Sequence, residues 1–321
     1  MIRYFKTIQP AALFTIPVVC LLLWLPGFFK AETVLEPYDS SILNGISTLP
    51  VFIQTLISII LVSMGAIYLN YVTTKHDVIF QHSYLPALMY AVLMSFHKEA
   101  IQFHPLLVSN ILIIRALDKT FSLFKNDSPV SPIFDGSFLL AIATLIYFPS
   151  FLIFFLFLYS IYNLRSFNFR EMMIAAVGFI LPFFFLAVYG FWTDTLVSST
   201  HNFFARFTIH KIQEELHDVQ SAIGIAVYIG LLVLMALIRL RSNFYRNTIK
   251  SRSTHEILFV FLILTLAGPL FLPAITFYHF TQLAIPFSIF LAYFFISAKR
   301  RMWIYEASLW ILLGFIVFSY F

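Results

Sequence analysis

Histidines, carboxylates and basic side chains are the groups in this sequence that can do chemistry, and they occur in short polar segments between long apolar runs. Histidine accepts and donates a proton near neutral pH, and a carboxylate beside it can act as a base or bind a cation. The candidate contacts to a substrate are His97, Lys98, Glu99, His104, Arg206 and His279. Because short loops must contain polar residues, a structural role is the alternative for the loop histidines.

His279 differs from the others because it lies inside an apolar run, between Phe277 and Gln282. A polar side chain in such a run is expected to face the interior of a helix bundle or a water-filled cavity. His279 is therefore either a hydrogen-bonded structural residue or a functional contact.

A second polar group lies in the apolar run from Pro105 to Phe124. Arg115, Asp118 and Lys119 have i, i+3 and i+4 spacing, which puts them on one side of a helix and allows Arg115 to pair with Asp118. Charge within a bilayer is costly unless it is paired or hydrated. These intramembrane polar residues either extend towards the inner interface or line a substrate pathway.

Motifs of well-known soluble sites are absent from the sequence. It has no G-x-x-x-x-G-K-S/T phosphate loop, no H-E-x-x-H zinc helix and no G-x-S-x-G nucleophile turn. Cys20 is the single cysteine, so neither an intramolecular disulfide nor a multi-cysteine metal site can form. No metal site is predicted, and the residues do not indicate a cofactor.

The composition indicates lipid as the main solvent of the outer surface. Hydrophobic residues make up 60% of the chain and charged residues 11%, against about 25% charged residues in an average soluble domain. The net charge of +5 does not indicate nucleic-acid binding, because the basic residues lie in short stretches between apolar runs rather than in one patch. The lipid bilayer is the expected partner.

Several apolar runs reach the length of about 20 residues that a transmembrane helix needs. Seven are clear: Ala11–Phe29, Leu49–Val72, Glu171–Trp192, Ser221–Arg239, Ile257–Phe271, Ala274–Ile296 and Ile304–Phe321. Four more are predicted in the middle of the chain: Val78–Phe96, Pro105–Phe124, Ser137–Phe148 and Ser150–Leu164. The alternative is that residues 137–164 form a single kinked helix.

The distribution of lysine and arginine supports this division, because cytoplasmic loops carry most of them. With the N-terminus inside, sixteen fall on the inner side and four on the outer side. The sequence thus predicts an all-α fold, a polytopic integral membrane helix bundle of about 11 transmembrane helices with a cytoplasmic N-terminus.

Residues 1–321 are expected to form a single transmembrane domain with two outer loops of some size. The first outer loop covers residues 30–48 and carries Glu32, Glu36 and Asp39. The second covers residues 193–220, where apolar residues recur at helical spacing opposite charged ones. We expect an interfacial amphipathic helix there.

Two stretches carry a resemblance to a known family. The first runs from His104-Pro105 through Asn110 to Arg115, and continues through Phe134-Asp135-Gly136 into a return broken by a proline. The second is Gln282-Leu283-Ala284-Ile285-Pro286-Phe287. In layout, residues 100–192 and 274–296 resemble polytopic membrane glycosyltransferases of the C-type fold. The whole chain also resembles uncharacterised, Phe-rich, multi-span bacterial membrane proteins, which implies a bacterial cytoplasmic (inner) membrane location.

The glycosyltransferase resemblance implies a polyprenyl-phosphate-linked sugar as donor and a carboxylate in the first outer loop as general base or metal ligand. Glu32, Glu36 and Asp39 are then the catalytic candidates. The sequence departs from the family because it has no adjacent acidic pair or acid-plus-arginine pattern in the first outer loop, and we expect no large outer domain after the last spans.

Three functional hypotheses follow. The first is a protein that handles envelope polysaccharide or lipid-linked sugar, either as a transferase or without catalysis. The second is a structural subunit of an envelope complex, with envelope proteins as partners. The third is a secondary transporter whose pathway is lined by Arg115, Asp118 and His279.

Overall fold

The fold is known from a computed structural model of the chain. The structure describes residues 1–7, 9–29, 49–165, 167–197, 219–243, 248–272, 276–298 and 302–320, together with Ile46 and Thr200. Regular structure in these ranges is entirely helical. The all-α prediction is therefore confirmed.

The helices follow one another with short connections in most places. The α-helices are α1 Ile2–Lys6, α2 Pro10–Trp24, α4 Val51–Lys75, α5 Leu85–Met94, α6 Pro105–Phe121, α7 Val130–Ile146, α8 Phe151–Leu164, α9 Phe169–Trp192, α11 Val219–Ser242, α12 Ile249–Ala267, α13 Ala284–Ile296 and α14 Met302–Phe318. Short 3₁₀ segments are η1 Leu25–Phe28, η3 Phe148–Ser150, η5 Gly268–Phe271 and η6 Phe277–Leu283.

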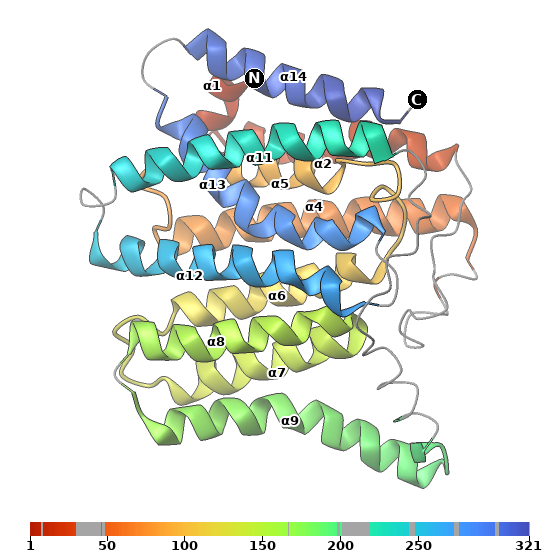
Figure 1. Cartoon of the computed structure of the whole chain (residues 1–321), viewed down its shortest axis with the longest axis vertical. Coiled ribbons are helices and arrows are strands. Elements are labelled where there is room, and N and C mark those ends of the chain that lie inside the picture. The colour runs from red at the N-terminus through yellow and green to blue at the C-terminus, as the bar shows by residue number, and fades with distance from the viewer. Residues whose placement is uncertain are drawn as a thin grey trace.

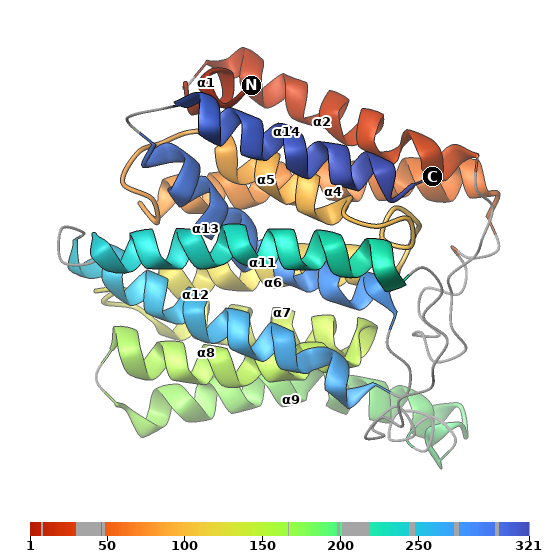
Figure 2. The same cartoon turned by 45° about the horizontal axis from the view of Figure 1, so that its top comes forward.

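The long helices lie side by side with their axes nearly parallel, and the chain turns alternately at the two ends of the bundle (Figures 1 and 2). The N-terminal end holds α1, which is fixed by a hydrogen bond from the Tyr84 backbone N–H to the Phe5 carbonyl at 2.9 Å. The opposite end holds the turn between η3 and α8 and the segment η6. At the centre of the bundle α5 and α13 pack together, and every residue of α5 is buried.

Many of these helices have the length and apolarity of membrane spans. Six segments can cross a bilayer by these criteria: Pro10–Phe28, Val51–Lys75, Phe169–Trp192, Ile223–Ser242, Ile249–Phe271 and Phe277–Ile296. Shorter apolar helices cover Leu85–Met94, Val130–Ile146, Phe148–Leu164 and Met302–Phe318. The described residues thus contain six candidate membrane spans, whereas the total of eleven spans and the side of the N-terminus stay predictions.

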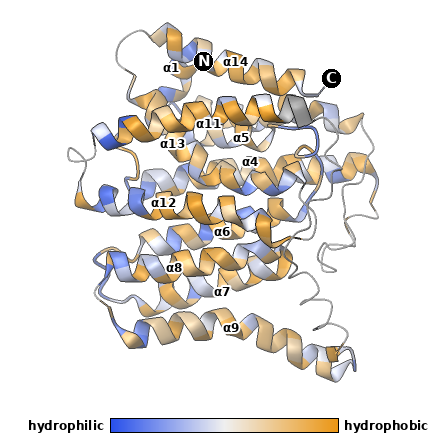
Figure 3. Cartoon of the chain, in the orientation of Figure 1, coloured by the Kyte–Doolittle hydropathy of each residue, from blue (hydrophilic) through white to orange (hydrophobic). Residues whose placement is uncertain are grey.

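The outer surface of the bundle suits contact with lipid. Hydrophobic residues cover most of the length of the helices, and hydrophilic residues gather near the N-terminal end of the bundle (Figure 3). Helix α9 lies at one edge, where it packs mainly on α7. Its surface is strongly apolar, since Phe191 and Trp192 expose 74% and 86% of their areas. In water such exposure would be costly, whereas lipid accepts it.

The middle of the chain forms two helices rather than one kinked helix. Helix α7 ends where Tyr147 adopts an extended conformation, η3 makes the turn, and α8 returns alongside α7. Helix α7 begins at Val130, seven residues before the predicted start at Ser137. The additional turns carry Asp135, whose carboxylate is bound by Lys119 of α6 at 2.7 Å. Hydropathy alone underestimated the length of α7, because its first turns include polar residues such as Asp135, which pairs with Lys119.

A buried polar cluster where three helix breaks meet

Helix ends in three parts of the chain meet at the same place in the bundle, in the 3₁₀ segments η3, η5 and η6, which we call the helix breaks. Pro149 lies in η3, Pro269 lies in η5, and η6 precedes α13. Proline has no backbone N–H, so it cannot continue the regular helical hydrogen bonding at η3 and η5. A Cβ placed on Gly268 would lie 3.5 Å from the Cβ of Pro149 and 3.8 Å from Oε1 of Gln282. The three breaks are therefore in direct contact.

Serine and glutamine side chains link these breaks. Ser150 Oγ lies 3.0 Å from Ser109 Oγ of α6, and Gln282 Nε2 donates to Ser150 Oγ at 3.3 Å. The three side chains are buried. Buried polar groups need hydrogen-bond partners, and these residues provide them for one another across α6, η3 and η6.

His279 is held by a tyrosine from the end of α7. Tyr147 Oη lies 3.2 Å from His279 Nδ1, and the two rings stack with their centroids 5.7 Å apart. Both side chains are buried, with 4% of each residue exposed. The expectation that His279 faces the interior of the bundle is correct, and the partner it finds is a neutral phenol.

The segment from residue 97 to residue 104 packs on η6. Glu99 Oε2 accepts a hydrogen bond from the Phe277 backbone N–H at 2.9 Å, and the rings of His97 and Phe277 lie 4.3 Å apart. The carboxylate thus satisfies an N–H at the start of η6. Lys98, in the same segment, is half-buried.

His104 ends this segment and directly precedes α6. It is fully buried, and its ring stacks on Tyr278 at 5.2 Å. Neither ring nitrogen has a hydrogen bond of ordinary geometry in the described part of the chain. Burial lowers the pKa of His104 to about 3, and the Ala100 backbone acts in the opposite direction. The ring is therefore neutral at physiological pH and keeps one donor and one acceptor.

We refer to these side chains as the buried polar cluster. Its members come from α6 with its N-cap, the α7–α8 turn and η6: His104, Ser109, Tyr147, Ser150, His279 and Gln282. The serine, tyrosine and glutamine side chains are uncharged at neutral pH, and a histidine ring can be uncharged as well. All of them can form hydrogen bonds. Such a set suits hydroxyl groups better than an ion, because no carboxylate or permanent cation belongs to it.

The structure brings together only some of the predicted site residues. His97, Glu99, His104 and His279 converge on η6 and its surroundings. Lys98 lies in the same segment as His97, whereas Arg115 and Asp118 lie elsewhere in the bundle. Four predicted members lie outside the described residues, namely Glu32, Glu36, Asp39 and Arg206. The 193–220 amphipathic helix also lies mostly outside them. This interfacial helix therefore stays a prediction.

Sequence reasoning missed Tyr147, Ser109, Ser150 and Gln282. A serine or tyrosine within an apolar helix is common, so none of them is distinctive alone. Tyr147 and Ser150 lie on either side of Pro149, and Gln282 follows His279 by three residues. These positions were the available signal, since breaks in apolar helices can mark binding sites. Ser109 had no such signal.

The intramembrane charges form a separate cluster towards the N-terminal end. Asp118 lies 2.8 Å from Lys75 Nζ and 2.7 Å from His76 Nε2, and Tyr68 Oη donates to it at 3.4 Å. The helical spacing predicted Arg115 as its partner, whereas Arg115 is exposed and the bound cation comes from α4. Asp118 is therefore neutralised within the bundle.

A metal centre has no support in the described residues. They contain no group of three or more histidine, cysteine, aspartate or glutamate side chains arranged to hold an ion. The buried polar cluster must be interpreted from its own hydrogen-bonding groups.

Comparison with known proteins assigns the chain to a family. Residues 42–321 match DUF6427, a family of unknown function. The chain belongs to this family. No curated protein and no solved structure matches it.

The part that matches DUF6427 contains the whole buried polar cluster and the Asp118 cluster. The catalytic candidates Glu32, Glu36 and Asp39 precede residue 42 and lie outside the match. The comparisons lend no support to the glycosyltransferase resemblance. For this DUF6427 protein, the argument for a function must come from the cluster itself.

Proposed function

We propose that this DUF6427 protein handles a lipid-linked sugar in the bacterial cytoplasmic membrane, and that the buried polar cluster binds the hydroxyl-rich headgroup. The observation that carries the proposal is the convergence of neutral donors and acceptors at three helix breaks within an otherwise apolar bundle. Polar groups are costly in such surroundings and mark functional sites by default.

The chemistry of the cluster favours a neutral ligand. A buried site that hydrogen-bonds hydroxyls needs paired donors and acceptors, which serine, glutamine, tyrosine and neutral histidine provide. His104 in particular presents two ring nitrogens with no ordinary hydrogen bond in the described residues. An ion-coupled pathway would instead need a carboxylate within the cluster.

The position of the breaks favours a ligand with a lipid chain. Phe151 of α8 and Phe271 of η5 meet edge to face at 5.6 Å beside the breaks. Next to them Phe155 and Leu270 expose 54% and 61% of their areas. An apolar surface therefore continues from the breaks to the lipid-facing side, where a polyprenyl chain can lie.

The proposed topology has eleven spans and a cytoplasmic N-terminus. Sixteen of the twenty lysines and arginines then face the cytoplasm, as expected for a bacterial inner-membrane protein. The buried polar cluster would lie towards the outer leaflet, on the same side as Glu32, Glu36 and Asp39. If the protein is a transferase, one of these acids is the general base.

The direct test is binding of a polyprenyl-phosphate hexose by the purified full-length chain, measured by native mass spectrometry in neutral detergent. The comparison ligand is the same polyprenyl phosphate without the hexose. We expect the hexose-bearing lipid to bind more tightly, and we expect His104→Phe and Gln282→Leu each to reduce that preference. Loss of one hydrogen bond corresponds to roughly three- to tenfold weaker binding.

His82→Phe is the matched control, because the His82 side chain is 47% exposed near the N-terminal end of the bundle. Equal binding of the two lipids by the wild-type chain would exclude recognition of the sugar. If binding holds, Glu32→Gln, Glu36→Gln and Asp39→Asn distinguish a transferase from a noncatalytic protein, since only a transferase loses sugar transfer while it keeps the ligand.

The two other hypotheses predict different outcomes. A transporter lined by Arg115, Asp118 and His279 is less well supported, because Lys75 and His76 already neutralise Asp118. A structural subunit of an envelope complex should co-purify with its protein partners in mild detergent. A monodisperse monomer that binds the lipid-linked sugar would argue against this role.

A further inference from the structure

Arg239 lies close to the end of α11, and its positive charge has no carboxylate partner among the described residues. Its Nη1 donates to Tyr305 Oη at 3.0 Å and its Nη2 donates to the Ser297 carbonyl at 2.6 Å. Its Nε is buried without a hydrogen-bond partner. No carboxylate in the described part of the chain lies within salt-bridge distance of it.

A second cation binds the same helix end. Lys6 Nζ donates to the carbonyls of Ile296 and Ala298 at 2.9 and 3.3 Å. Carbonyls at a helix C-terminus carry partial negative charge, equivalent to about half an electron in total, and cations stabilise them. Glu306 lies instead 3.7 Å from the Met1 amino group.

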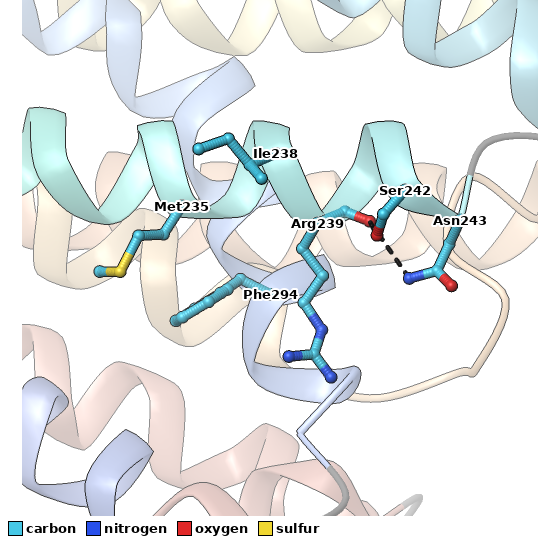
Figure 4. Close-up of a pocket in the computed structure, with 6 residues that line it drawn as sticks. All are labelled: Met235, Ile238, Arg239, Ser242, Asn243 and Phe294. Carbon is cyan, nitrogen blue, oxygen red and sulfur yellow. Dashed lines mark hydrogen bonds between the residues drawn. The ribbon is translucent and has the colours of Figure 1, made fainter.

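A hollow of about 440 Å³ opens beside Arg239. It is lined by Met235, Ile238, Arg239, Ser242, Asn243 and Phe294 (Figure 4). In Figure 4 Arg239 extends from α11 past Phe294, while Ser242 and Asn243 lie at the end of the helix. Both bind the Arg239 carbonyl, at 2.8 and 3.1 Å. The hollow thus has polar groups at one end and apolar side chains at the other.

The apolar part of the hollow faces the lipid side of the bundle. Met235 and Ile238 expose 45% and 62% of their areas. An acyl chain can therefore lie against them while its headgroup lies at the helix end. Guanidinium groups bind phosphate with strong, charge-assisted hydrogen bonds. Basic pockets between transmembrane helices at the membrane surface are suited to anionic lipid headgroups.

We propose that the hollow between α11 and α13 binds an anionic phospholipid, with the lipid phosphate on Arg239 and one acyl chain along Met235 and Ile238. This site lies at the opposite end of the bundle from the buried polar cluster and is independent of the proposed function. The lipid phosphate provides a counter-charge for Arg239, which has no salt bridge to a carboxylate of the described residues.

The test is retention of phosphatidylglycerol by the full-length chain in neutral detergent, measured by native mass spectrometry against phosphatidylcholine with the same acyl chains. We expect preferential retention of phosphatidylglycerol. Arg239→Gln should weaken it about fivefold or more, the effect of one basic residue near an anionic surface. Arg241→Gln is the matched control, because it removes the same charge from the same helix end but does not line the hollow.

Arg239→Gln also removes bonds to Tyr305 and Ser297, so a second variant keeps the test valid if that protein folds poorly. Ile238→Trp fills the hollow while Arg239 stays in place, and it should also abolish the preference. Three results would overturn the proposal: unchanged phosphatidylglycerol retention in both variants, equal losses in Arg239→Gln and Arg241→Gln, or full competition by inorganic phosphate at the lipid concentration.

Discussion

The Glu99 carboxylate accepts a hydrogen bond from the Phe277 backbone N–H at 2.9 Å, and this bond joins the segment before α6 to the start of η6. The two residues come from distant parts of the sequence, yet the bond holds together both sides of the buried polar cluster. A hydrogen bond to a charged group contributes about 1.5–3 kcal/mol when it is sheltered from water.

Glu99→Ala should lower the free energy of unfolding by about 2 kcal/mol, because the Phe277 N–H loses its acceptor. The measurement is thermal unfolding in detergent, combined with hydrogen exchange of the Phe277 amide, which should become faster. Glu256→Gln is a suitable control, since Glu256 accepts its hydrogen bond from Asn163 at an exposed position. Unchanged exchange at Phe277 in the Glu99 variant would contradict this role.

Tyr147→Phe removes the hydroxyl that meets His279 and leaves the stacked ring in place. We expect a loss of about 1 kcal/mol in stability, the usual contribution of one neutral hydrogen bond. Histidine ¹⁵N NMR should show a changed Nδ1 signal for His279. If that signal is the same in the variant and the wild-type chain, the hydrogen bond does not exist in solution.

Asp118→Asn should destabilise the bundle by about 2 kcal/mol, because it removes the charge that Lys75 and His76 bind. Asp135→Asn makes the same change where the carboxylate is 41% exposed and bound by Lys119, so it should cost about 0.5 kcal/mol. Chemical unfolding of both variants checks the difference. Similar losses would mean that burial does not strengthen the Asp118 interactions.

The free energy of unfolding should decrease as the pH is lowered below neutrality, because His104 is buried in the folded chain. Its pKa is about 3 in the folded chain and near 6.5 when exposed, so the unfolded chain binds a proton first as pH falls. The loss should approach about 1.4 kcal/mol for each pH unit between these values. Unfolding midpoints at pH 7, 6, 5 and 4 measure it.

His104→Gln should flatten this pH profile, since glutamine does not titrate. His82→Gln should leave the profile unchanged, because the His82 side chain is 47% exposed. An identical slope in the His104 variant and the wild-type chain would assign the acid sensitivity to other groups.

Alanine at two glycines should have effects of opposite sign. A Cβ on Gly178 of α9 would overlap Ser137 Oγ and lie 2.9 Å from the Phe134 carbonyl of α7. Gly178→Ala should therefore cost about 1–3 kcal/mol by forcing α9 away from α7. A Cβ on Gly230 of α11 meets nothing within 4 Å, so Gly230→Ala should be neutral or stabilising, by up to about 1 kcal/mol. Thermal unfolding distinguishes the two, and equal shifts would contradict the close packing of α7 on α9.

The positions of the helices could be predicted well because lipid imposes a local rule. A backbone in hydrocarbon must satisfy its own hydrogen bonds, so an apolar run of sufficient length forms a helix whatever its neighbours are. The spans around Leu49–Val72 and Glu171–Trp192 follow from this rule. It is weaker where a helix begins with paired polar residues, which is why the start of α7 at Val130 differed from the prediction.

The sequence by itself therefore determined that the chain is all-α, that several of its helices can span a membrane, and where most of its helices lie. Only the tertiary structure decided that Asp118 binds Lys75 rather than Arg115, and that His279 meets Tyr147. Helix formation depends on contacts three or four residues apart, which a sequence displays directly. Contacts between helices depend on how each helix is rotated and packed against its neighbours, and that is set by the fit of side chains across the whole bundle.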